Sequence, residues 1–370
     1  MFDVAVIGGG MVGAAIAYGC AARGARTIML DEGDTAHRAA RANAGLIFSQ
    51  GKGEGSPAYA AWTRASIGLW PELADALSLA GETSIGFRHL GVVSFCLGEQ
   101  ELEERRALLR RMHNQAGRPA APVRLLDRGD VCALMPRAAL GGEVSGGSYS
   151  PEDGDVNPLL LLRGLRAGFR RAGGTHLPGR AVERVRAEAD GFSLTTQTDT
   201  LRAAKVVVAC GLGIPRLAAM LGMAVPVHPV RGQMIVTERL AKLLDLPTSG
   251  VRQTVEGSLQ IGTTFEEGVA EPATRVEDLT RMAARAVRIL PALAGANVIR
   301  AWAGLRPVTP DGCPVYARST AHPGAFAAVC HSGVTLAAAH AGPLAAAILA
   351  GRLPDGLAEL TPERFAVPPD

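Results

Sequence analysis

The stretch VAVIGGGMVGAAIAYGCAARGARTIMLDEGD, residues 4–34, decides the fold of this chain. It begins with a short run of apolar, mostly β-branched residues, 4–7, which predicts a buried parallel strand. Residues 11–23 suit a helix, and residues 27–30 suit a second strand that ends at Asp31. A strand, a helix and a strand in this order predict an α/β fold with a parallel sheet.

Glycines at fixed positions join the first strand to the helix. Gly8, Gly10 and Gly13 have the G-x-G-x-x-G spacing, which provides a tight turn, close approach of a pyrophosphate to the backbone, and helix–strand packing. The start of the helix, with Met11 and Val12, offers N–H groups and the positive end of the helix dipole to a phosphate. The segment therefore predicts a Rossmann-like dinucleotide-binding unit.

The residues after the second strand indicate which dinucleotide is bound. Asp31 follows Gly13 at roughly the spacing expected of a carboxylate that hydrogen bonds a ribose hydroxyl. Residues 36–55, AHRAARANAGLIFSQGKGEG, then interrupt the pattern with a long loop of small and basic residues. An NAD enzyme would continue with regular strand and helix units, whereas the longer FAD needs a loop to cover it. We therefore expect FAD, with a nicotinamide dehydrogenase as the alternative.

Composition narrows the class of protein. The 370 residues are 48% hydrophobic and 20% charged, and 38 basic and 35 acidic residues give a net charge of +3. This balance indicates a globular protein that binds neither nucleic acid nor a membrane surface. The cysteines are scattered without metal-ligand spacing, and the chain start lacks a basic signal-peptide region, so we expect a cytoplasmic protein without disulfides or a metal site.

Residues 324–351 carry no Asp, Glu, Lys or Arg and are long enough to cross a bilayer. They predict instead a strand at 325–329, a polar turn at 330–333, and an alanine-rich helix that contains His340 and Pro343. Because alanine is a weak hydrophobe, we expect this helix to lie in a soluble core and no transmembrane segment to be present.

The remaining pattern predicts a discontinuous organisation. Helices are expected at 57–79, 99–115, within 150–174, and at 276–290; an antiparallel strand pair at 85–97; short strands at 180–186, 192–196 and 205–209; and antiparallel strands within 225–238 and 251–268. The turn after the strand at 205–209, with Cys210 and Gly211, permits close approach of a ligand. The predicted architecture is a Rossmann-like FAD-binding domain (1–85, 147–222 and 298–370) and a discontinuous antiparallel-sheet substrate-binding domain (86–146 and 223–297), with the pocket between them.

Several motifs together carry a family resemblance. VAVIGGGMVG, PEDGDVNP, VVVACGLG, WAGLRPVTPDGCPVY and CHSGVTLAAAHAG resemble the FAD-dependent D-amino-acid oxidase superfamily, which includes glycine and sarcosine oxidases. The resemblance covers nearly the whole chain. ARANAGLIFSQGKG, PEDGDVNPLLL and HPGAFAAVCHSGVTLAAAHAG are most similar to the catalytic β subunits of opine oxidases, D-hydroxyproline dehydrogenase and hydrogen cyanide synthase.

The resemblance implies how FAD is held. The glycine turn would face the pyrophosphate, Asp31 or its neighbour Glu32 the adenosine ribose, and Val182 the adenine through its backbone. The N–H groups of residues 333–335 would start a helix beside the flavin pyrimidine edge, although Thr335 also suits a simple helix cap. The residues expected to contact FAD are Gly8, Gly10, Met11, Val12, Gly13, Asp31, Glu32, Arg41, Asn43, Ala44, Gly45, Leu46, Val182, Cys210, Gly211, Arg306, Gly333, Val334 and Thr335.

The resemblance also implies the substrate contacts. Arg306 would bind the substrate carboxylate and place the α-carbon beside the flavin, with a structural ion pair as the alternative. His331 is a candidate acid or base, or forms a structural hydrogen bond. Arg252 and Glu266 either contact substrate or are ordinary polar residues of the sheet.

Two departures from the family pattern matter. Glycine oxidases carry a second arginine where this chain reads Cys330-His331-Ser332, so a two-point carboxylate clamp is not expected from that segment. Sarcosine oxidases attach FAD to a cysteine at the position of Gly304, and Cys313 lies on the wrong side of the Thr-Pro-Asp run. The sequence therefore predicts noncovalent FAD.

The activity implied is oxidation of the C–N bond of an amino acid, by hydride transfer to flavin N5 and hydrolysis of the released imine. The similar β subunits favour a secondary amine: an N-substituted glycine, an opine or D-hydroxyproline. Electrons would pass to partner subunits that carry iron–sulfur centres and a second flavin, because the chain lacks the cysteine spacing for a cluster of its own. The alternatives are a free-standing glycine/sarcosine-type oxidase that forms H2O2 from O2, and a noncatalytic flavin-carrying partner subunit.

Overall fold

The computed structural model describes residues 1–33, 37–81, 84–115 and 122–366. An eight-stranded, mostly parallel sheet forms one end of the molecule. The order is β17-β18-β11-β1-β2-β8, and β9 and β10 extend it from β11. β1 is parallel to both β2 and β11, as the opening sequence predicts. The strands are β1 (Phe2–Ile7), β2 (Thr27–Asp31), β8 (Thr175–Pro178), β9 (Arg184–Glu188), β10 (Gly191–Thr195), β11 (Thr200–Val208), β17 (Val315–Arg318) and β18 (Ala325–Val329).

Both faces of this sheet are covered, so β1 is apolar at every buried position. Val4 and Val6 face a core that includes the helices α1, α3 and α6, whereas Ala5 and Ile7 face a second core that includes α7. Burial on both sides explains why β1 shows no polar alternation. The helices of this part are α1 (Met11–Ala21), α2 (Pro57–Gly68), α3 (Trp70–Gly81), α6 (Pro158–Arg171), α7 (Ile214–Ala219), α9 (Ala337–Ala339) and α10 (Ala345–Leu349).

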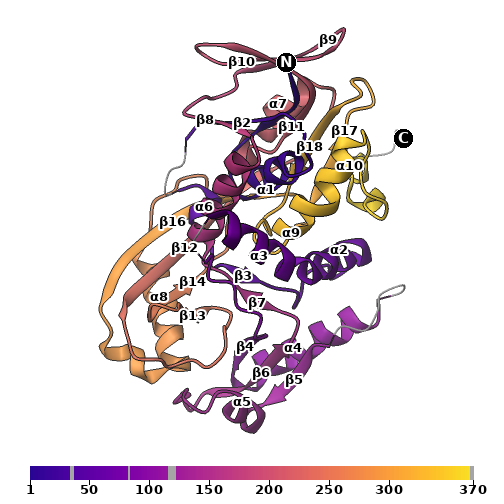
Figure 1. Cartoon of the computed structure of the whole chain (residues 1–370). Coiled ribbons are helices and arrows are strands. Elements are labelled where there is room, and N and C mark those ends of the chain that lie inside the picture. The colour runs from indigo at the N-terminus through magenta and orange to yellow at the C-terminus, as the bar shows by residue number, and fades with distance from the viewer. Residues whose placement is uncertain (34–36, 82–83, 116–121, 367–370) are drawn as a thin grey trace.

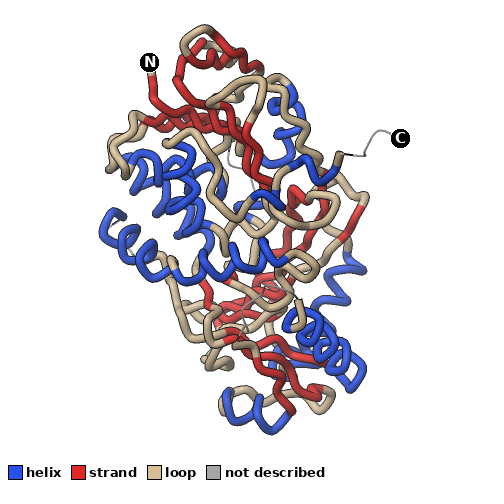
Figure 2. Tube along the Cα trace, turned by 90° about the vertical axis from the view of Figure 1, so that its right-hand side faces the viewer, coloured by secondary structure: helices blue, strands red, loops and turns tan. Residues whose placement is uncertain are grey.

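Two antiparallel sheets lie at the other end of the elongated molecule (Figure 1 and Figure 2). One has the order β13-β14-β12-β15, with β16 also paired to β12; the other has the order β4-β6-β5. They share a hydrophobic core with helix α8. The elements are β4 (Val92–Leu97), β5 (Arg124–Asp127), β6 (Val144–Ser150), β12 (His228–Arg239), β13 (Val251–Gln253), β14 (Ser258–Gly262), β15 (Glu266–Glu267), β16 (Val298–Val308), α4 (Gly98–His113), α5 (Arg128–Leu134) and α8 (Val276–Ile289).

Short elements connect the two ends. β3 (Leu46–Ile47) pairs with β7 (Gly154–Asp155), which joins the loop after β2 to the segment before α6. The remaining short helical turns are η1 (Ala39–Arg41), η2 (Gly211–Gly213), η3 (Pro291–Gly295), η4 (His340–Leu344), η5 (Ala358–Leu360) and η6 (Pro362–Phe365).

The fold class is confirmed, but four local predictions differ from the structure. Residues 85–91 are not a strand, and β4 pairs with β6 instead of with them. The strand expected at 180–186 begins at Arg184, and β8 was not predicted. β16, placed with the FAD-binding domain by the predicted boundary at 298, pairs along most of its length with β12 of the antiparallel sheet.

The alanine-rich C-terminal helix is the fourth difference. Residues 333–336 form a turn, helix α9 begins only at Ala337, and a π-helical segment, η4, interrupts the helix at Gly342 and Pro343. Proline lacks the N–H that a continuous helix requires, which explains the interruption. Within the described residues, no helix has both the length and the apolar character that a bilayer crossing requires.

Candidate functional site

A cavity of about 480 Å³ lies where the carboxyl ends of β1, β2 and β18 meet the start of α1 and the side of β16. Ligands of open α/β sheets bind at this edge of the strands. The predicted residues that line the cavity are Gly8, Gly10, Met11, Val12, Asp31, Glu32, Asn43, Ala44, Gly45, Leu46, Val182, Cys210, Gly211, Arg306, His331, Gly333, Val334 and Thr335. Gly13, Arg41, Arg252 and Glu266 do not line it.

The glycine turn shows why each glycine is required. Gly8 has φ +109°, and a Cβ on Gly13 would lie 1.9 Å from the carbonyl oxygen of Gly8, so Gly13 serves the packing of α1 against the turn. A Cβ on Gly10 would meet only the Ala40 side chain, at 4.0 Å, and would therefore project into open space. The turn keeps the start of α1 accessible, which fits a pyrophosphate.

Asp31 supports the turn as well as facing the cavity. Its Oδ2 accepts a hydrogen bond from the Gly9 N–H at 2.6 Å, and its Oδ1 accepts one from the Gly33 N–H at 3.0 Å. The neighbouring Glu32 forms an ion pair with Arg38. Asp31 thus fixes the turn to the end of β2, at the position expected for the ribose end of the dinucleotide.

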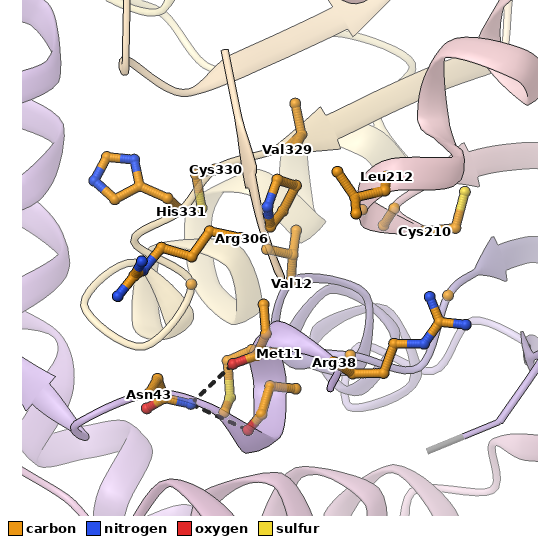
Figure 3. A pocket seen from close by; sticks show the side chains of 18 of the residues that line it. Met11, Val12, Arg38, Asn43, Cys210, Leu212, Arg306, Val329, Cys330 and His331 are labelled. Atoms are coloured by element: carbon orange, nitrogen blue, oxygen red, sulfur yellow. Dashed lines mark hydrogen bonds between the residues drawn. The ribbon is translucent and has the colours of Figure 1, made fainter. Parts of the chain in front are cut away.

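The covering loop is held by its own side chains. Asn43 Nδ2 donates to the carbonyls of Ala39 and Ala40 at 3.3 and 3.1 Å (Figure 3). Its Oδ1 accepts from the Gly45 N–H at 3.0 Å. Arg41 is exposed, and its backbone carbonyl accepts a 3.3 Å hydrogen bond from the Trp302 indole. Asn43 therefore shapes the loop, and Arg41 contributes to it through its backbone.

Thr335 ties this loop to the C-terminal segment. Its hydroxyl donates to the Leu46 carbonyl at 3.3 Å and accepts from the Phe48 N–H at 3.2 Å. It does not cap a helix, because the cap position of α9 is Leu336. The turn at 333–336 replaces the helix start that we expected beside the flavin.

The opposite end of the cavity is formed by residues after β8 and β11. Val182 is buried, and its carbonyl accepts a hydrogen bond from Arg216 at 3.1 Å. Gly211 has φ +59°, which favours glycine at this turn. Burial raises the pKa of the Cys210 thiol to about 12, so this thiol is protonated at neutral pH.

Arg306 enters the cavity from β16 (Figure 3). Its Nη1 donates to the Thr264 carbonyl at 2.9 Å, and its guanidinium lies 5.7 Å from the centre of the Phe265 ring. Gly232 on the neighbouring strand leaves room for it, because a Cβ there would lie 2.2 Å from Arg306 Nη1. Desolvation lowers the pKa of Arg306, and Glu266 opposes this shift. Arg306 forms no ion pair with any described residue, so its charge is available to a ligand.

His331 lies near Arg306 in the same cavity (Figure 3). Desolvation, followed by the charges of Lys52 and Arg306, lowers the pKa of His331 to about 3. The imidazole is therefore neutral at physiological pH, and it provides no proton from a cationic form.

Sequence reasoning missed a polar cluster formed by Lys52, Tyr59 and Ser332. Lys52 Nζ donates to Ser332 Oγ at 2.5 Å, and Ser332 Oγ lies 2.5 Å from the Tyr59 hydroxyl. Lys52 and Ser332 line the cavity. They are separated by most of the chain, so only the fold brings them together; the sequence signal was a single lysine within a glycine-rich loop.

Arg252 and Glu266, predicted to contact substrate, are engaged elsewhere. Arg252 Nη1 lies 2.6 Å from Asp155, and Glu266 is paired with the buried Arg231. Both side chains are held by internal ion pairs outside the cavity, in agreement with the alternative that they are polar residues of the sheet.

Comparison with known proteins agrees with this geometry. The family model named DAO, FAD dependent oxidoreductase, matches residues 3–347. This chain belongs to the DAO family. The B subunit of opine oxidase from Agrobacterium tumefaciens (strain Ach5) is 38% identical over 328 residues, which cover 89% of this chain and 88% of the relative. The B subunit of opine oxidase from Rhizobium meliloti is 37% identical over 363 residues, which cover 98% and 97%.

A solved structure of the DAO type is similar over the whole fold. Glycine oxidase from Geobacillus kaustophilus superposes with a TM-score of 0.86 at 27% identity, covering 97% of this chain and 98% of that one. The DAO-family chain is thus an FAD-dependent oxidoreductase, and the open glycine turn and the small residues that line the cavity fit an FAD molecule.

Proposed function

We propose that this DAO-family enzyme oxidises the C–N bond of an amino acid, and that the substrate is a secondary amine of the N-substituted glycine, opine or D-hydroxyproline type. Arg306 carries the proposal, because a guanidinium without an internal acidic partner suits bidentate binding of a carboxylate. The similarity to the B subunits of two opine oxidases supports a substrate with a substituted nitrogen.

The residues of the chain would then act mainly by positioning. Arg306 holds the carboxylate and so fixes the position of the α-carbon, which orients its C–H bond for the reaction. Neutral His331 borders the substrate without adding a positive charge that would repel a protonated amine. FAD, held noncovalently, supplies the acceptor for the hydride of the α-carbon. The amine must be neutral when the hydride leaves, and water hydrolyses the imine product.

The acceptor of the electrons is the second part of the proposal. The two opine oxidase relatives are, by name, subunits of a larger enzyme, which supports transfer of electrons to a partner chain. A free-standing oxidase that forms H2O2 is the competing candidate, and the similarity to a glycine oxidase structure favours it. The FAD-binding domain would comprise residues 1–85, 147–222 and 309–370. β16 would contribute Arg306 from the substrate side.

The test is anaerobic reduction of the bound flavin by a panel of secondary amino acids. Wild-type protein should bleach, and Arg306→Met should lose about 10- to 100-fold in reduction efficiency while FAD stays bound, because a charged hydrogen bond is lost. Arg300→Met, an exposed arginine of the same strand, is the matched control and should behave as wild type. Unchanged reduction in Arg306→Met would contradict the proposal.

The acceptor is tested by repeating the reaction in air. Release of H2O2 in step with amine consumption would support the free-standing oxidase. Slow reaction with oxygen, together with fast reduction of an added dye, would support transfer to a partner subunit.

A further inference from the structure

Lys52 brings a second positive charge to the cavity that contains Arg306. It lies in the loop after β3, whereas Arg306 lies on β16, so the two cations reach the cavity from different parts of the fold. Lys52, Arg306 and His331 all line this cavity, and the charges of Lys52 and Arg306 contribute to the lowered pKa of His331.

The ammonium of Lys52 has spare hydrogen-bonding capacity. An ammonium group has three N–H donors, and one of them is used by Ser332 Oγ at 2.5 Å. The Ser332 hydroxyl is also in contact with Tyr59, so the position of Ser332 is fixed from its other side. Ser332 thus holds Lys52 in place and leaves donors free for a ligand.

No acidic residue of the described chain forms an ion pair with Lys52. Asp153 is the acid that acts on it, but its carboxylate accepts from the Ser49 N–H at 3.0 Å and from Gln50 Nε2 at 3.2 Å. Desolvation lowers the pKa of Lys52 to about 8, and the amine is still mainly protonated at neutral pH. A desolvated cation without a counter-charge is costly, and an anionic ligand would offset that cost.

We infer that Lys52 binds a second carboxylate of the substrate, opposite the one held by Arg306. The site would then select secondary amines with a carboxylate on each nitrogen substituent, which is the chemistry of an amino acid N-linked to a carboxyalkyl group. This inference rests on the proposed function, in which Arg306 binds the first carboxylate. A monocarboxylic amine would leave Lys52 without a counter-charge, so discrimination comes from the unpaired cation as well as from the new contact.

The experiment compares two amines that differ in the second carboxylate. Iminodiacetate and N-ethylglycine are titrated anaerobically into FAD-loaded protein, and the dissociation constant is taken from the perturbation of the flavin spectrum and from the concentration dependence of flavin reduction. Wild type should bind iminodiacetate about 10- to 100-fold more tightly than N-ethylglycine. Lys52→Met should remove this preference, because iminodiacetate loses its contact to the ammonium, whereas N-ethylglycine should bind no more weakly than it does to wild type.

Two further variants complete the design. Lys52→Arg keeps the charge and should keep the preference for iminodiacetate. Lys242→Met makes the same substitution at an exposed lysine and should match wild type. An equal preference for iminodiacetate in wild type and Lys52→Met would overturn the inference, as would a wild type without preference, which needs no variant to fold.

The outcomes separate this inference from the proposed function. If wild type binds both amines with equal affinity and both reduce its flavin, the role of Lys52 is contradicted and the proposed function is not. Lys52→Met could instead retain the iminodiacetate preference but show an altered flavin spectrum and weaker FAD binding. This result would assign Lys52 to the cofactor and would also overturn the inference. If no amino acid of the panel reduces the flavin, the proposed function fails and the inference fails with it.

Discussion

At the scale of single residues, the site depends on charges that the fold leaves without internal partners. Arg306 and Lys52 both lie in the cavity without an ion pair to a described residue, whereas Arg231 and Arg252 are neutralised by Glu266 and Asp155. The sequence could indicate Arg306, because its surrounding motif is distinctive. It could not indicate Lys52, whose contact to Ser332 depends on packing between segments far apart in the chain.

His331 provides a pH prediction. Because desolvation and nearby cations lower its pKa to about 3, the imidazole is neutral on both sides of its ordinary pKa of about 6.5. The rate of flavin reduction between about pH 5 and pH 8 should therefore show no limb that belongs to His331. His331→Gln should give a profile of the same shape as wild type. A limb near pH 6.5 that disappears in the variant would show that His331 titrates in this range and acts as an acid or base.

At the scale of elements, the turn between β1 and α1 separates two roles that the motif combines. The three glycines could be predicted from their spacing alone, whereas the structure distinguishes the surroundings of Gly13 from those of Gly10. Gly13 meets the backbone of Gly8, whereas Gly10 faces open space beside Ala40. A side chain at Gly13 would clash with the backbone and destabilise the fold, whereas a side chain at Gly10 would obstruct the approach of the ligand.

A pair of alanine variants tests this separation. Gly13→Ala should destabilise the protein by about 1–3 kcal/mol, because its Cβ would overlap a backbone oxygen. Gly10→Ala should fold with nearly unchanged stability and bind FAD more weakly. Chemical denaturation of the FAD-free proteins and fluorescence titration with FAD measure the two effects. Equal loss of stability in both variants would contradict the assignment.

Element prediction succeeded where the pattern has a local cause. Helix α6 begins at Pro158 and is capped by Asn157, whose side chain accepts hydrogen bonds from the N–H groups of Leu159 and Leu160. This cap is visible in the sequence. The strand predicted at residues 85–91 is wrong, because the alternation there reflects side-chain packing. The ring of Phe87 stacks on that of Trp70 in α3, with 5.5 Å between the ring centres. The pairing of β16 with β12 is a long-range contact that no local pattern specifies.

At the scale of the whole molecule, one buried carboxylate connects segments from different sheets. Asp155 of β7 lies 2.6 Å from Arg252 of β13 and 2.6 Å from Arg88, and the Arg88 side chain also donates to the Gln253 carbonyl at 3.0 Å. β7 pairs with β3, next to the loop that covers the cavity. The position of this loop relative to the antiparallel sheet therefore depends on Asp155.

Neutralising this carboxylate should weaken the whole assembly. Asp155→Asn would leave buried Arg252 without a counter-charge and should lower the free energy of unfolding by about 3–5 kcal/mol. Glu54→Gln, which removes an exposed ion pair with Arg111, is the control and should cost at most about 1 kcal/mol. Urea denaturation gives both values, and a change of similar small size in the two variants would contradict a connecting role for Asp155.

In the proposed function, Arg306 holds a substrate carboxylate beside FAD in the cavity between the two ends of the molecule. A crystal structure of the FAD-loaded protein with a non-reactive amino-acid analogue tests it most directly. We expect an isoalloxazine ring against residues 330–335 and an analogue carboxylate in contact with the Arg306 guanidinium. A ring bound elsewhere, or a carboxylate bound away from Arg306, would contradict it.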